Sequence, residues 1–330
     1  MPTVVHCANP FLPVTTVWMY DQIRALKRYR PFVITQMRQN ADRFPLEGVY
    51  SAQDLGLIPR QVYRLIRKVR GTYAGYERWM RDMGADLIHA HFGQEGYRCL
   101  TAKKNTDIPL LTTFYGMDVS QLPRRPIWQK RFGRLFAEGD LFLAEGTHMA
   151  NALIGIGALA DRVRVQHLGV DLAAMPFVEP AARNSDAPVV LTYAAFREKK
   201  GLVYAVQAFA KIAGTHPTAR LRMIGDGPLR GELERAISQW GLGDRVDLLG
   251  YLSRNAALGE LRQASVLLYP SLTASDGDTE GGAPVALIEA MASGACVVSS
   301  LHADIPEVVP NGTCGMLFPE RDVNGLAEGL

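Results

Sequence analysis

The sequence predicts an α/β protein built from two doubly wound domains in series. The chain has 330 residues, whereas single domains usually run to about 50 to 250 residues. Apolar runs of strand length alternate along it with amphipathic helical patterns, which is typical of parallel sheets covered by helices. The segment 179–187 interrupts this alternation with Pro, Ala, Asn and Ser and indicates a linker. We therefore expect domains over residues 1–178 and 188–330.

The first domain is expected to hold six strands because six short apolar runs, bounded by polar or turn residues, follow one another. A longer amphipathic pattern over residues 58–82 predicts a helix between the second and third of them. The six expected strands cover residues 2–7, 31–37, 85–91, 109–114, 140–145 and 163–168.

The second domain repeats the alternation. Three amphipathic patterns, over residues 203–214, 228–240 and 255–264, predict helices between its strands, and residues 322–330 begin another helical pattern at which the chain stops. We expect this domain to be a shortened form, and we expect the two domains to face a cleft at the carboxyl edges of their sheets, where such folds bind ligands. The six expected strands cover residues 189–194, 219–225, 245–250, 265–271, 295–300 and 314–318.

The stretch EGGAPVALIEAMASG, residues 280–294, predicts a glycine turn that opens a helix over 284–293. Gly281 and Gly282 permit positive φ, Pro284 suits the first helical position, and Gly294 suits the stop. Free amides at a helix N-terminus bind anions, so the backbone from Gly282 through Ala283 and Pro284 to Val285 is a candidate phosphate site.

A basic loop supplies the charge that the helix terminus lacks. FREKKGL, residues 196–202, follows the first strand of the second domain and carries Arg197, Lys199 and Lys200. Such side chains can neutralise a diphosphate leaving group, or they can form a solvated basic turn. Gly225 and Gly227 of the turn GDGP are expected to approach the nucleotide. No G-x-G-x-x-G occurs, which argues against a dinucleotide oxidoreductase.

Two carboxylates flank the glycine turn. Because they would repel a phosphate, they need a different partner. Glu289, inside the helix, is predicted to accept hydrogen bonds from ribose hydroxyls, and Glu280, before the turn, from the sugar being transferred. The alternatives that need no ligand are that Glu289 lies on an exposed helix face and that Glu280 is a loop carboxylate that caps the helix. The pair Asp276 and Asp278 mimics a metal-binding D-x-D, and we interpret it as loop polarity.

Composition restricts the class of protein. With 48% hydrophobic and 21% charged residues it has ordinary globular composition. No basic leader precedes an apolar run and no run reaches about 18 apolar residues, so we expect a cytoplasmic protein with four buried, reduced cysteines. From Asp54 to Arg134 there are fifteen Lys or Arg against seven Asp or Glu. This excess indicates either solvated helices or a basic surface that meets an anionic acceptor or the anionic lipids on the inner face of the plasma membrane. Nucleic acid is not expected, because no nucleic-acid-binding module accompanies the basic residues.

The order of these motifs resembles a known family. FREKKGL, RMIGDGPLRGELE, SVLLYPS, TEGGAPVALIEAMASGACVVSS, IPEVV and GTCGMLF look like the C-terminal domain of the retaining glycosyltransferases of family 4, whose GT-B fold has two Rossmann-like domains. DLIHAHFG, FYGMD and HLGVDL continue the resemblance through the first domain and are similar to bacterial enzymes that build exopolysaccharides and other surface glycans.

The resemblance implies metal-independent sugar transfer, with retained configuration, from a nucleoside diphosphate sugar to a glycan or lipid-linked saccharide; no cofactor is expected. It places Glu280 and Glu289 at the paired glutamates and Lys200 at the phosphates. Two departures stand out. Eight residues separate the glutamates where seven are usual, which leaves Gly281, a further expected donor-binding residue, as an alternative to Glu280 at the first position. Ala195 stands where an arginine is common, with Arg197 as a possible substitute. A degenerate nucleotide-sugar-binding or partner-binding protein therefore stays open, as does a nucleotide sugar epimerase.

The first domain should contribute the acceptor side. FYGMD follows a strand, and Tyr115 stands where many relatives have histidine, near the transferred sugar; a phenol there is a poor base at neutral pH. Asp118 is expected either to orient this loop or to contact acceptor, and Gly116 and His91 are expected at the acceptor. His89 and His91 share a strand face, but no third ligand accompanies them in the sequence, so no metal site is predicted.

Overall fold

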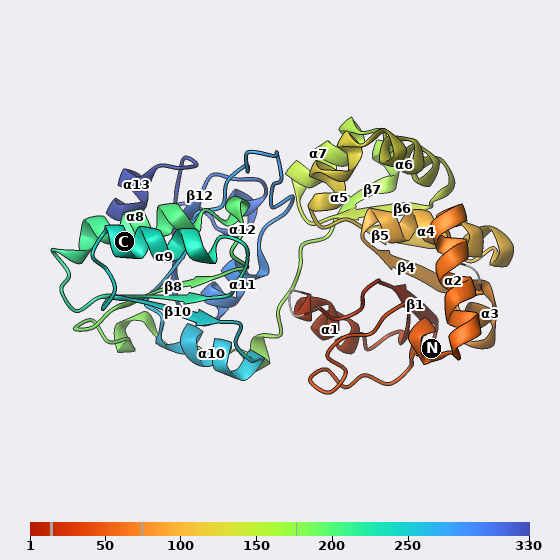
Figure 1. The fold of residues 1–330 in the computed structure, drawn as a ribbon, viewed down its shortest axis with the longest axis horizontal. Coiled ribbons are helices and arrows are strands. Elements are labelled where there is room, and N and C mark those ends of the chain that lie inside the picture. Colours follow the sequence, from red (N-terminus) through yellow and green to blue (C-terminus); the bar gives the residue numbers. More distant parts are fainter. Residues whose placement is uncertain (14–15, 74, 176) are drawn as a thin grey trace. The chain divides into compact units, whose positions relative to one another are not determined.

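The computed structural model describes residues 1–13, 16–73, 75–175 and 177–330. The chain divides into two compact units, Met1–His167 and Leu168–Leu330, and each is an α/β unit with one parallel sheet, as the sequence predicts (Figure 1). The predicted linker 179–187 lies within the second unit.

Unit 1 holds a seven-stranded parallel sheet in the order β3-β2-β1-β4-β5-β6-β7. Six strands match the predicted runs, and β3 is a short edge strand that the sequence pattern did not reveal. Because all the strands are parallel, the loops that follow them meet at one edge. The strands are β1 Thr3–Cys7, β2 Arg30–Thr35, β3 Val49–Ser51, β4 Leu87–His91, β5 Leu110–Thr113, β6 Leu141–Ala144 and β7 Val163–Val165.

The helices of unit 1 pack around an aromatic core. Phe114, Phe132 and Phe142 are buried beside one another, and this core lies between α4, α6 and the strands β4 and β5. The α-helices are α1 Val17–Arg24, α2 Leu57–Arg70, α3 Tyr76–Asp82, α4 Gly93–Thr106, α5 Met117–Ser120, α6 Pro126–Glu138 and α7 Thr147–Gly155; the 3-10 turns are Ala52–Asp54, Leu122–Arg124 and Ala160–Arg162.

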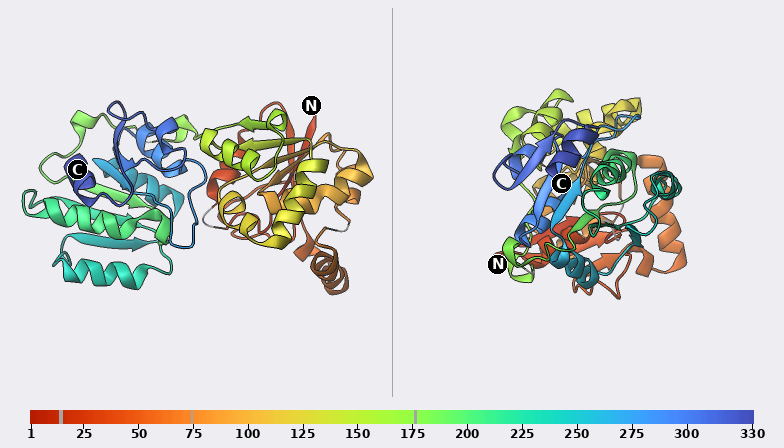
Figure 2. Two further views of the ribbon diagram at one scale, coloured as in Figure 1. Left: turned by 90° about the horizontal axis from the view of Figure 1, so that it is seen from above. Right: turned by 90° about the vertical axis from the view of Figure 1, so that its left-hand side faces the viewer.

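The prediction of one helix over 58–82 is wrong, because two helices, α2 and α3, cover this range. Gly71 adopts φ +72° and its N–H bonds Arg67, which ends α2 in a left-handed cap. Figure 2 shows α2 at the margin of unit 1, away from the sheet. The amphipathic period alone did not reveal this break.

Unit 2 holds a six-stranded parallel sheet in the order β10-β9-β8-β11-β12-β13. The six strands match the six predicted runs. Helices cover both of its faces (Figure 1). The strands are β8 Val189–Tyr193, β9 Arg220–Ile224, β10 Val246–Gly250, β11 Val266–Tyr269, β12 Cys296–Ser300 and β13 Gly315–Phe318. The α-helices are α8 Leu202–Ala213, α9 Arg230–Gln239, α10 Arg254–Gln263, α11 Val285–Ala292, α12 Ile305–Val308 and α13 Val323–Gly329, with 3-10 turns at Leu172–Ala174, Pro180–Ala182 and Glu198–Lys200.

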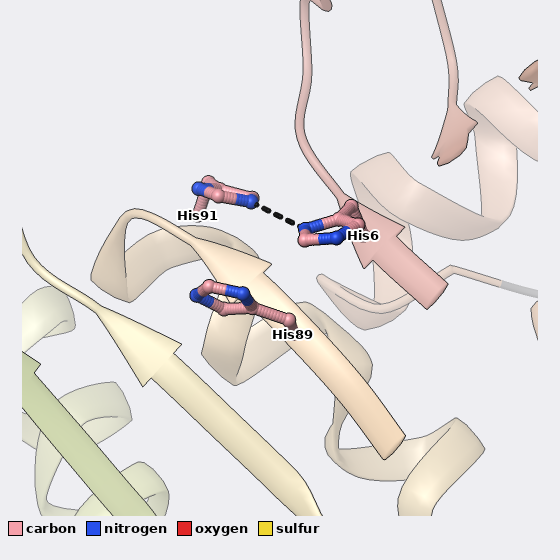
Figure 3. Close-up of side chains that lie close together, drawn as sticks. All are labelled: His6, His89 and His91. Atoms are coloured by element: carbon pink, nitrogen blue, oxygen red, sulfur yellow. Dashed lines mark hydrogen bonds between the residues drawn. The ribbon is translucent and has the colours of Figure 1, made fainter. Parts of the chain in front are cut away.

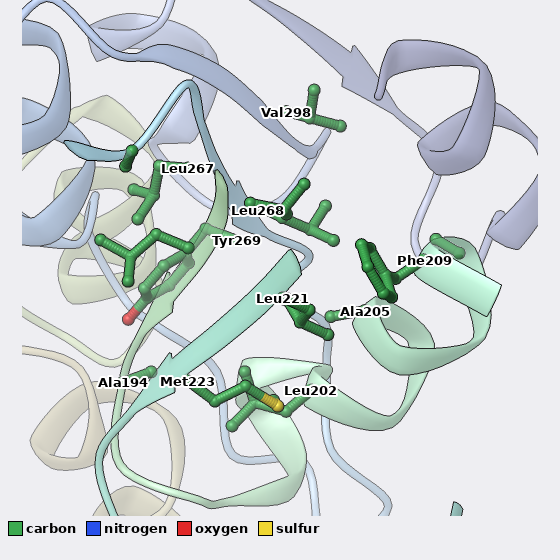
Figure 4. Close-up of a cluster of buried hydrophobic side chains, with 14 of the residues drawn as sticks. Ala194, Leu202, Ala205, Phe209, Leu221, Met223, Leu267, Leu268, Tyr269 and Val298 are labelled. Atoms are coloured by element: carbon green, nitrogen blue, oxygen red, sulfur yellow. The ribbon is translucent and has the colours of Figure 1, made fainter. Parts of the chain in front are cut away.

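The core of unit 2 explains why its strands read as continuous apolar runs. Leu267, Leu268 and Leu221 are fully buried in the central strands. Leu268 and Leu221 lie on the face that Phe209 of α8 covers, and Leu267 lies on the opposite face (Figure 4). A strand buried on both faces has no polar alternation.

Residues that precede β8 are tied to unit 2. The N–H of Val178 bonds the carbonyl of Ser293 at 3.0 Å, and the Arg183 guanidinium bonds the carbonyls of Arg262 and Ala264. Because of these contacts the boundary between the two units falls after His167 and not at the predicted linker 179–187.

The expectation of four buried cysteines needs adjustment, whereas the search for a membrane-spanning helix agrees with the sequence. Among the cysteines, Cys7 and Cys99 are buried as expected, but Cys296 and Cys314 are exposed. Within the described residues, no helix has both the length and the apolar content needed to cross a membrane.

Candidate active site

The loops at the carboxyl edge of the unit 2 sheet interlock around the basic loop. The N–H of Leu272, after β11, bonds the carbonyl of Lys199 at 2.9 Å. Gly201 adopts φ +63°, and a Cβ there would lie 1.9 Å from the carbonyl oxygen of Pro270. Only glycine allows these two loops to come so close, so the FREKKGL and SVLLYPS segments form one surface.

Lys200 and Glu280 form an ion pair at the centre of this surface. The Lys200 ammonium lies 2.7 Å from Glu280 Oε2 and donates to the Tyr269 hydroxyl at 2.9 Å. The second carboxylate oxygen of Glu280 accepts from Ser271 at 2.7 Å. Lys200 and Glu280 are two of the predicted site residues, and the fold brings them into direct contact across 80 residues of sequence.

The ionisation of Glu280 is controlled by its basic neighbours. Burial by itself raises the pKa of this carboxyl, but the ammonium groups of Lys200 and Lys199, with the hydrogen bonds that Glu280 accepts, outweigh burial and lower the pKa below its ordinary value. Glu280 is thus an anion at neutral pH that already has a cationic partner.

The other two basic residues of the loop differ from Lys200. Lys199 lies 3.2 Å from Asp278 and donates to the carbonyl of Thr279 at 2.8 Å. Asp278 is therefore an ion-pair partner that holds the loop. The Arg197 side chain is exposed and makes no hydrogen bond or ion pair with the residues that the structure describes, so it is free to meet an anionic ligand.

A histidine supports the backbone at Glu280. The Glu280 N–H donates to His302 Nε2 at 3.2 Å, which requires that the imidazole proton sit on Nδ1, 2.7 Å from Glu320. Glu320 also accepts from the N–H and hydroxyl of Thr273. The sequence did not indicate His302, because its contact with Glu280 depends on how β12 and β13 end beside the glycine turn.

The helix after the glycine turn has an open N-terminus. Helix α11 begins at Val285, one residue later than predicted, because Pro284 takes an extended conformation at the N-cap, and no side chain of the described residues caps the helix. Gly281 adopts φ +77°, as expected of the turn; Gly282 and Ala283 are buried. The uncapped amides of this helix can bind an anion.

The end of α11 is confirmed as predicted. Gly294 has φ +83°, and the N–H of Ala295 bonds the carbonyl of Ala290, which is a Schellman cap.

Glu289 is buried in α11 and does not lie on an exposed helix face. Its side chain is paired with Arg254, at the start of α10. A carboxylate can accept several hydrogen bonds, and the expectation that Glu289 accepts from ribose hydroxyls stays a prediction. Arg254 was not identified from the sequence, since no local spacing connects it with Glu289.

The glycines of the GDGP turn are needed by the fold. A Cβ on Gly225 would lie 1.9 Å from the carbonyl oxygen of Ala194, and one on Gly227 would lie 2.7 Å from that of Phe196. Their small size therefore lets this turn pack on the loop after β8. The expectation that they approach a nucleotide stays a prediction.

Unit 1 brings Tyr115 and His91 together at the carboxyl edge of its sheet. The Tyr115 hydroxyl lies 2.6 Å from His91 Nδ1, and the tyrosine ring contacts Trp18 and Phe92. Burial and, to a smaller degree, the charge of Glu145 raise the pKa of Tyr115 well above its usual value, so the phenol stays protonated. His91 is buried with both ring nitrogens bonded, which argues against the direct acceptor contact expected of it.

Asp118 positions the Tyr115 loop. It is fully buried and accepts from the backbone N–H groups of Gly93, Tyr115 and Gly116 at 2.8, 3.0 and 3.0 Å. Gly116 has φ +124°, a conformation that favours glycine. Of the two roles left open for Asp118, this geometry supports orientation of the loop and not contact with an acceptor.

A third histidine joins the pair found in the sequence. His6 Nδ1 lies 2.9 Å from His91 Nε2, and the ring of His89 lies beside both (Figure 3). The sequence around HAHFG contains no third histidine, but the fold brings His6 beside this pair. Strands β1 and β4 are parallel neighbours with His6 opposite His89, and the strand order of a doubly wound sheet could have suggested this contact.

Comparison with known proteins identifies the family of both halves. Residues 15–174 match the model of Glycosyltransferase Family 4, and residues 177–330 match that of Glycosyl transferases group 1. The amylovoran biosynthesis glycosyltransferase AmsK of Erwinia amylovora is 34% identical over 252 residues, 75% of this chain and 61% of AmsK. WcaL of Salmonella typhimurium, whose name refers to colanic acid biosynthesis, is 35% identical over 252 residues, 74% of this chain and 61% of WcaL.

Solved structures agree with the fold. HepE of Anabaena, in a complex with UDP and glucose, has a TM-score of 0.77 at 19% identity, covering 99% of this chain and 88% of HepE. Sucrose-phosphate synthase of Thermosynechococcus elongatus has a TM-score of 0.77 at 20% identity, covering 100% and 88%. The chain spans 61% of the length of the curated relatives above. Its two halves match consecutive glycosyltransferase models in a GT-B arrangement of parallel sheets, and the chain belongs to the family 4 glycosyltransferases.

Proposed function

We propose that this protein transfers a sugar from a nucleoside diphosphate sugar to a saccharide acceptor during synthesis of an exopolysaccharide. The observation that carries the proposal is the convergence of Lys200, Glu280 and the open N-terminus of α11 at one edge of unit 2. Relatives named for amylovoran and colanic acid biosynthesis support the exopolysaccharide assignment.

The donor site combines anion binding with hydroxyl recognition. The uncapped amides of α11 and the exposed Arg197 supply positive potential for a diphosphate. In the proposed complex the diphosphate also receives a hydrogen bond from Lys200, whose ammonium has three donors. Glu280 then accepts from a hydroxyl of the transferred sugar, and Glu289 from the ribose. HepE binds UDP and glucose, so UDP-sugars are the first donors to test.

The same residues support a retaining, metal-independent transfer. Lys200 and Arg197 balance the charge of the departing diphosphate, which is the task that a divalent cation performs in other glycosyltransferases. The acceptor oxygen forms a bond to the anomeric carbon on the face from which the phosphate leaves, and the acceptor proton passes to the leaving phosphate oxygen. Tyr115 does not need to act as a base, which agrees with its raised pKa.

The acceptor is proposed to be a glycan or a lipid-linked saccharide, presented at an anionic membrane. Helix α2 carries five Lys or Arg and no Asp or Glu. Its apolar residues Leu57, Leu65 and Val69 are 77%, 60% and 74% exposed. An exposed apolar stripe beside basic residues is typical of helices that lie in a lipid interface, and each basic residue near such a surface contributes about 1 kcal/mol.

Donor binding and turnover are tested separately. The protein is titrated with UDP, GDP and ADP by calorimetry, and release of nucleotide from the matching sugar donors is then measured. NMR of a transferred sugar reports whether the anomeric configuration is retained. Binding without turnover on any donor and acceptor would favour the degenerate alternative, and absence of binding by all three nucleotides would refute the donor site.

Membrane contact is tested by flotation with vesicles. The variant Leu65→Gln/Val69→Gln should lose association with anionic vesicles, while Leu159→Gln, which changes an exposed leucine elsewhere in unit 1, should keep it. Association should weaken as salt rises. If the amount of protein that floats with the vesicles changes neither with the α2 substitutions nor with ionic strength, the proposed surface is contradicted.

A further inference from the structure

Three histidines from two neighbouring strands meet in unit 1. His6 lies on β1 and His89 and His91 on β4, and parallel pairing sets His6 opposite His89. Residues two apart in a strand point to the same face, so all three rings lie together (Figure 3). The ring centroids of His6 lie 5.1 and 5.2 Å from those of His89 and His91.

The spacing of the ring nitrogens suits a metal ion. One nitrogen from each ring lies within 4.8 Å of the other two, and His6 Nδ1 is 2.9 Å from His91 Nε2. Nitrogens bound to zinc at about 2.0 to 2.1 Å with tetrahedral angles lie roughly 3.3 Å apart. The one short separation, 2.9 Å, lies below this value and the 4.8 Å limit lies above it, so one ion could contact all three nitrogens after adjustment of the side chains.

The second nitrogen of two of the rings is already oriented. His89 Nε2 lies 2.7 Å from the Thr113 hydroxyl, and His91 Nδ1 lies 2.6 Å from the Tyr115 hydroxyl. Histidines that bind metals are usually held in this way, by an oxygen on the ring nitrogen that does not bind the metal. The remaining nitrogens, Nδ1 of His89 and Nε2 of His91, are then the ligand atoms.

The His6 ring is not held at its second nitrogen. The short contact to His91 is made by His6 Nδ1, and the other nitrogen, Nε2, is buried without a hydrogen-bond partner among the described residues. A buried polar atom without a partner costs stability, so no hydrogen bond at Nε2 opposes the ring adjustment that a metal at Nδ1 would require.

We propose that His6, His89 and His91 form a binding site for one Zn²⁺ or a similar divalent transition metal in unit 1. Three imidazoles suit zinc, copper or nickel, whereas magnesium and calcium require oxygen ligands. Three protein ligands leave a fourth position for water or another small donor. His89 is only partly buried and gives access from solvent. The site goes beyond the proposed sugar transfer and does not depend on it.

A metal ion at this site would determine which group donates in the hydrogen bond between His91 and Tyr115. With Nε2 of His91 on the metal, its proton lies on Nδ1 and is donated to the Tyr115 oxygen, 2.6 Å away. The phenol proton is then free to be donated to another group. Metal binding would thus couple the tautomer of a buried histidine to the donor direction of Tyr115, which the family resemblance implies to lie near the transferred sugar.

The test measures metal directly, in protein without a histidine tag. The chain is stripped with chelator, dialysed against Zn²⁺ and assayed by elemental analysis and calorimetry. We expect one zinc per chain, a loss of affinity of more than tenfold in His6→Ala, and no change in His216→Ala, which removes an exposed histidine of unit 2. Thr113→Val should weaken binding roughly 10- to 100-fold, as expected for a residue behind a ligand.

A second measurement distinguishes loss of a metal ligand from misfolding of the His6 variant. Co²⁺ should give the visible bands of a tetrahedral site in the parent and in His216→Ala, and these bands should weaken in Thr113→Val, whose side chain has nearly the shape of threonine. Circular dichroism checks that each apo variant is folded. Zinc below 0.2 equivalents in the parent, or equal zinc in the parent and His6→Ala, would overturn the proposal.

Discussion

Replacing Lys200 with methionine removes the charge of the central ion pair and keeps most of the side-chain volume. The side chains of Lys200 and Glu280 are only 15% and 6% exposed, and 2.7 Å separates their charged atoms. Removing one partner of a buried pair typically costs about 3 to 5 kcal/mol, because the other charge stays buried. Lys199 also attracts Glu280, so we expect the lower end, about 3 kcal/mol of unfolding free energy.

The effect should depend on pH in a defined direction. In the parent the pKa of Glu280 is lowered by folding, so the carboxylate adds stability above the unfolded pKa of about 4.5, and this stability is lost as pH falls. In Lys200→Met, burial should raise the pKa of Glu280, so the variant loses stability as pH rises above about 4.5. The parent and the variant should therefore differ more at pH 7 than at pH 5.

Urea and thermal unfolding measure the difference at both pH values. For a unit of this size, about 3 kcal/mol corresponds to a midpoint shift of roughly 6 to 12 °C. The double variant Lys200→Met/Glu280→Gln should recover most of the loss, and Lys211→Met, at an exposed position of α8, should have little effect. A loss below about 1 kcal/mol at pH 7, or no recovery in the double variant, would refute the reasoning.

Three further substitutions test other parts of the molecule. Arg98→Met removes the cation beside the buried carboxyl of Glu95, whose pKa burial raises, and should cost about 3 kcal/mol of unfolding free energy in urea at pH 7. The loss should be smaller at pH 5, and equal losses at both pH values would contradict this. Gly201→Ala should cost at least about 2 kcal/mol because of its positive φ and a carbonyl 1.9 Å from the new Cβ, whereas Gly214→Ala, with open space around it, should unfold like the parent. Glu289→Gln should weaken nucleoside diphosphate binding by about 1.5 to 3 kcal/mol in calorimetry, and an unchanged Kd would remove Glu289 from the donor site.

The phosphate-site prediction depended on local features and could be made from the sequence. The glycine turn, Pro284 and Gly294 predicted a helix over 284–293, and the structure places α11 at Val285–Ala292. FREKKGL was expected at the end of the first strand of its domain, and β8 ends at Tyr193 just before it. Strand ends, glycine turns and helix stops are determined within a few residues.

Partners that are distant in the sequence could not be predicted in the same way. Lys200 and Glu280 are 80 residues apart, Arg254 and Glu289 are 35 apart, and His6 and His91 are 85 apart. Each contact depends on which elements are neighbours in the fold, and that of the histidines also depends on the register between β1 and β4. A one-residue shift in a strand turns every side chain to the opposite face, and local spacing contains no information about that register.

By itself, then, the sequence determined the two parallel sheets, the positions of most strands and the loops that carry charge, because apolar periodicity and turn chemistry are short-range properties. Only the tertiary structure decided that Lys200 is neutralised by Glu280, that Asp118 holds a loop from a fully buried position, and that His6 completes a cluster with His89 and His91. These outcomes follow from packing and burial, which convert residues that are separate in the chain into ion pairs and hydrogen-bonded groups.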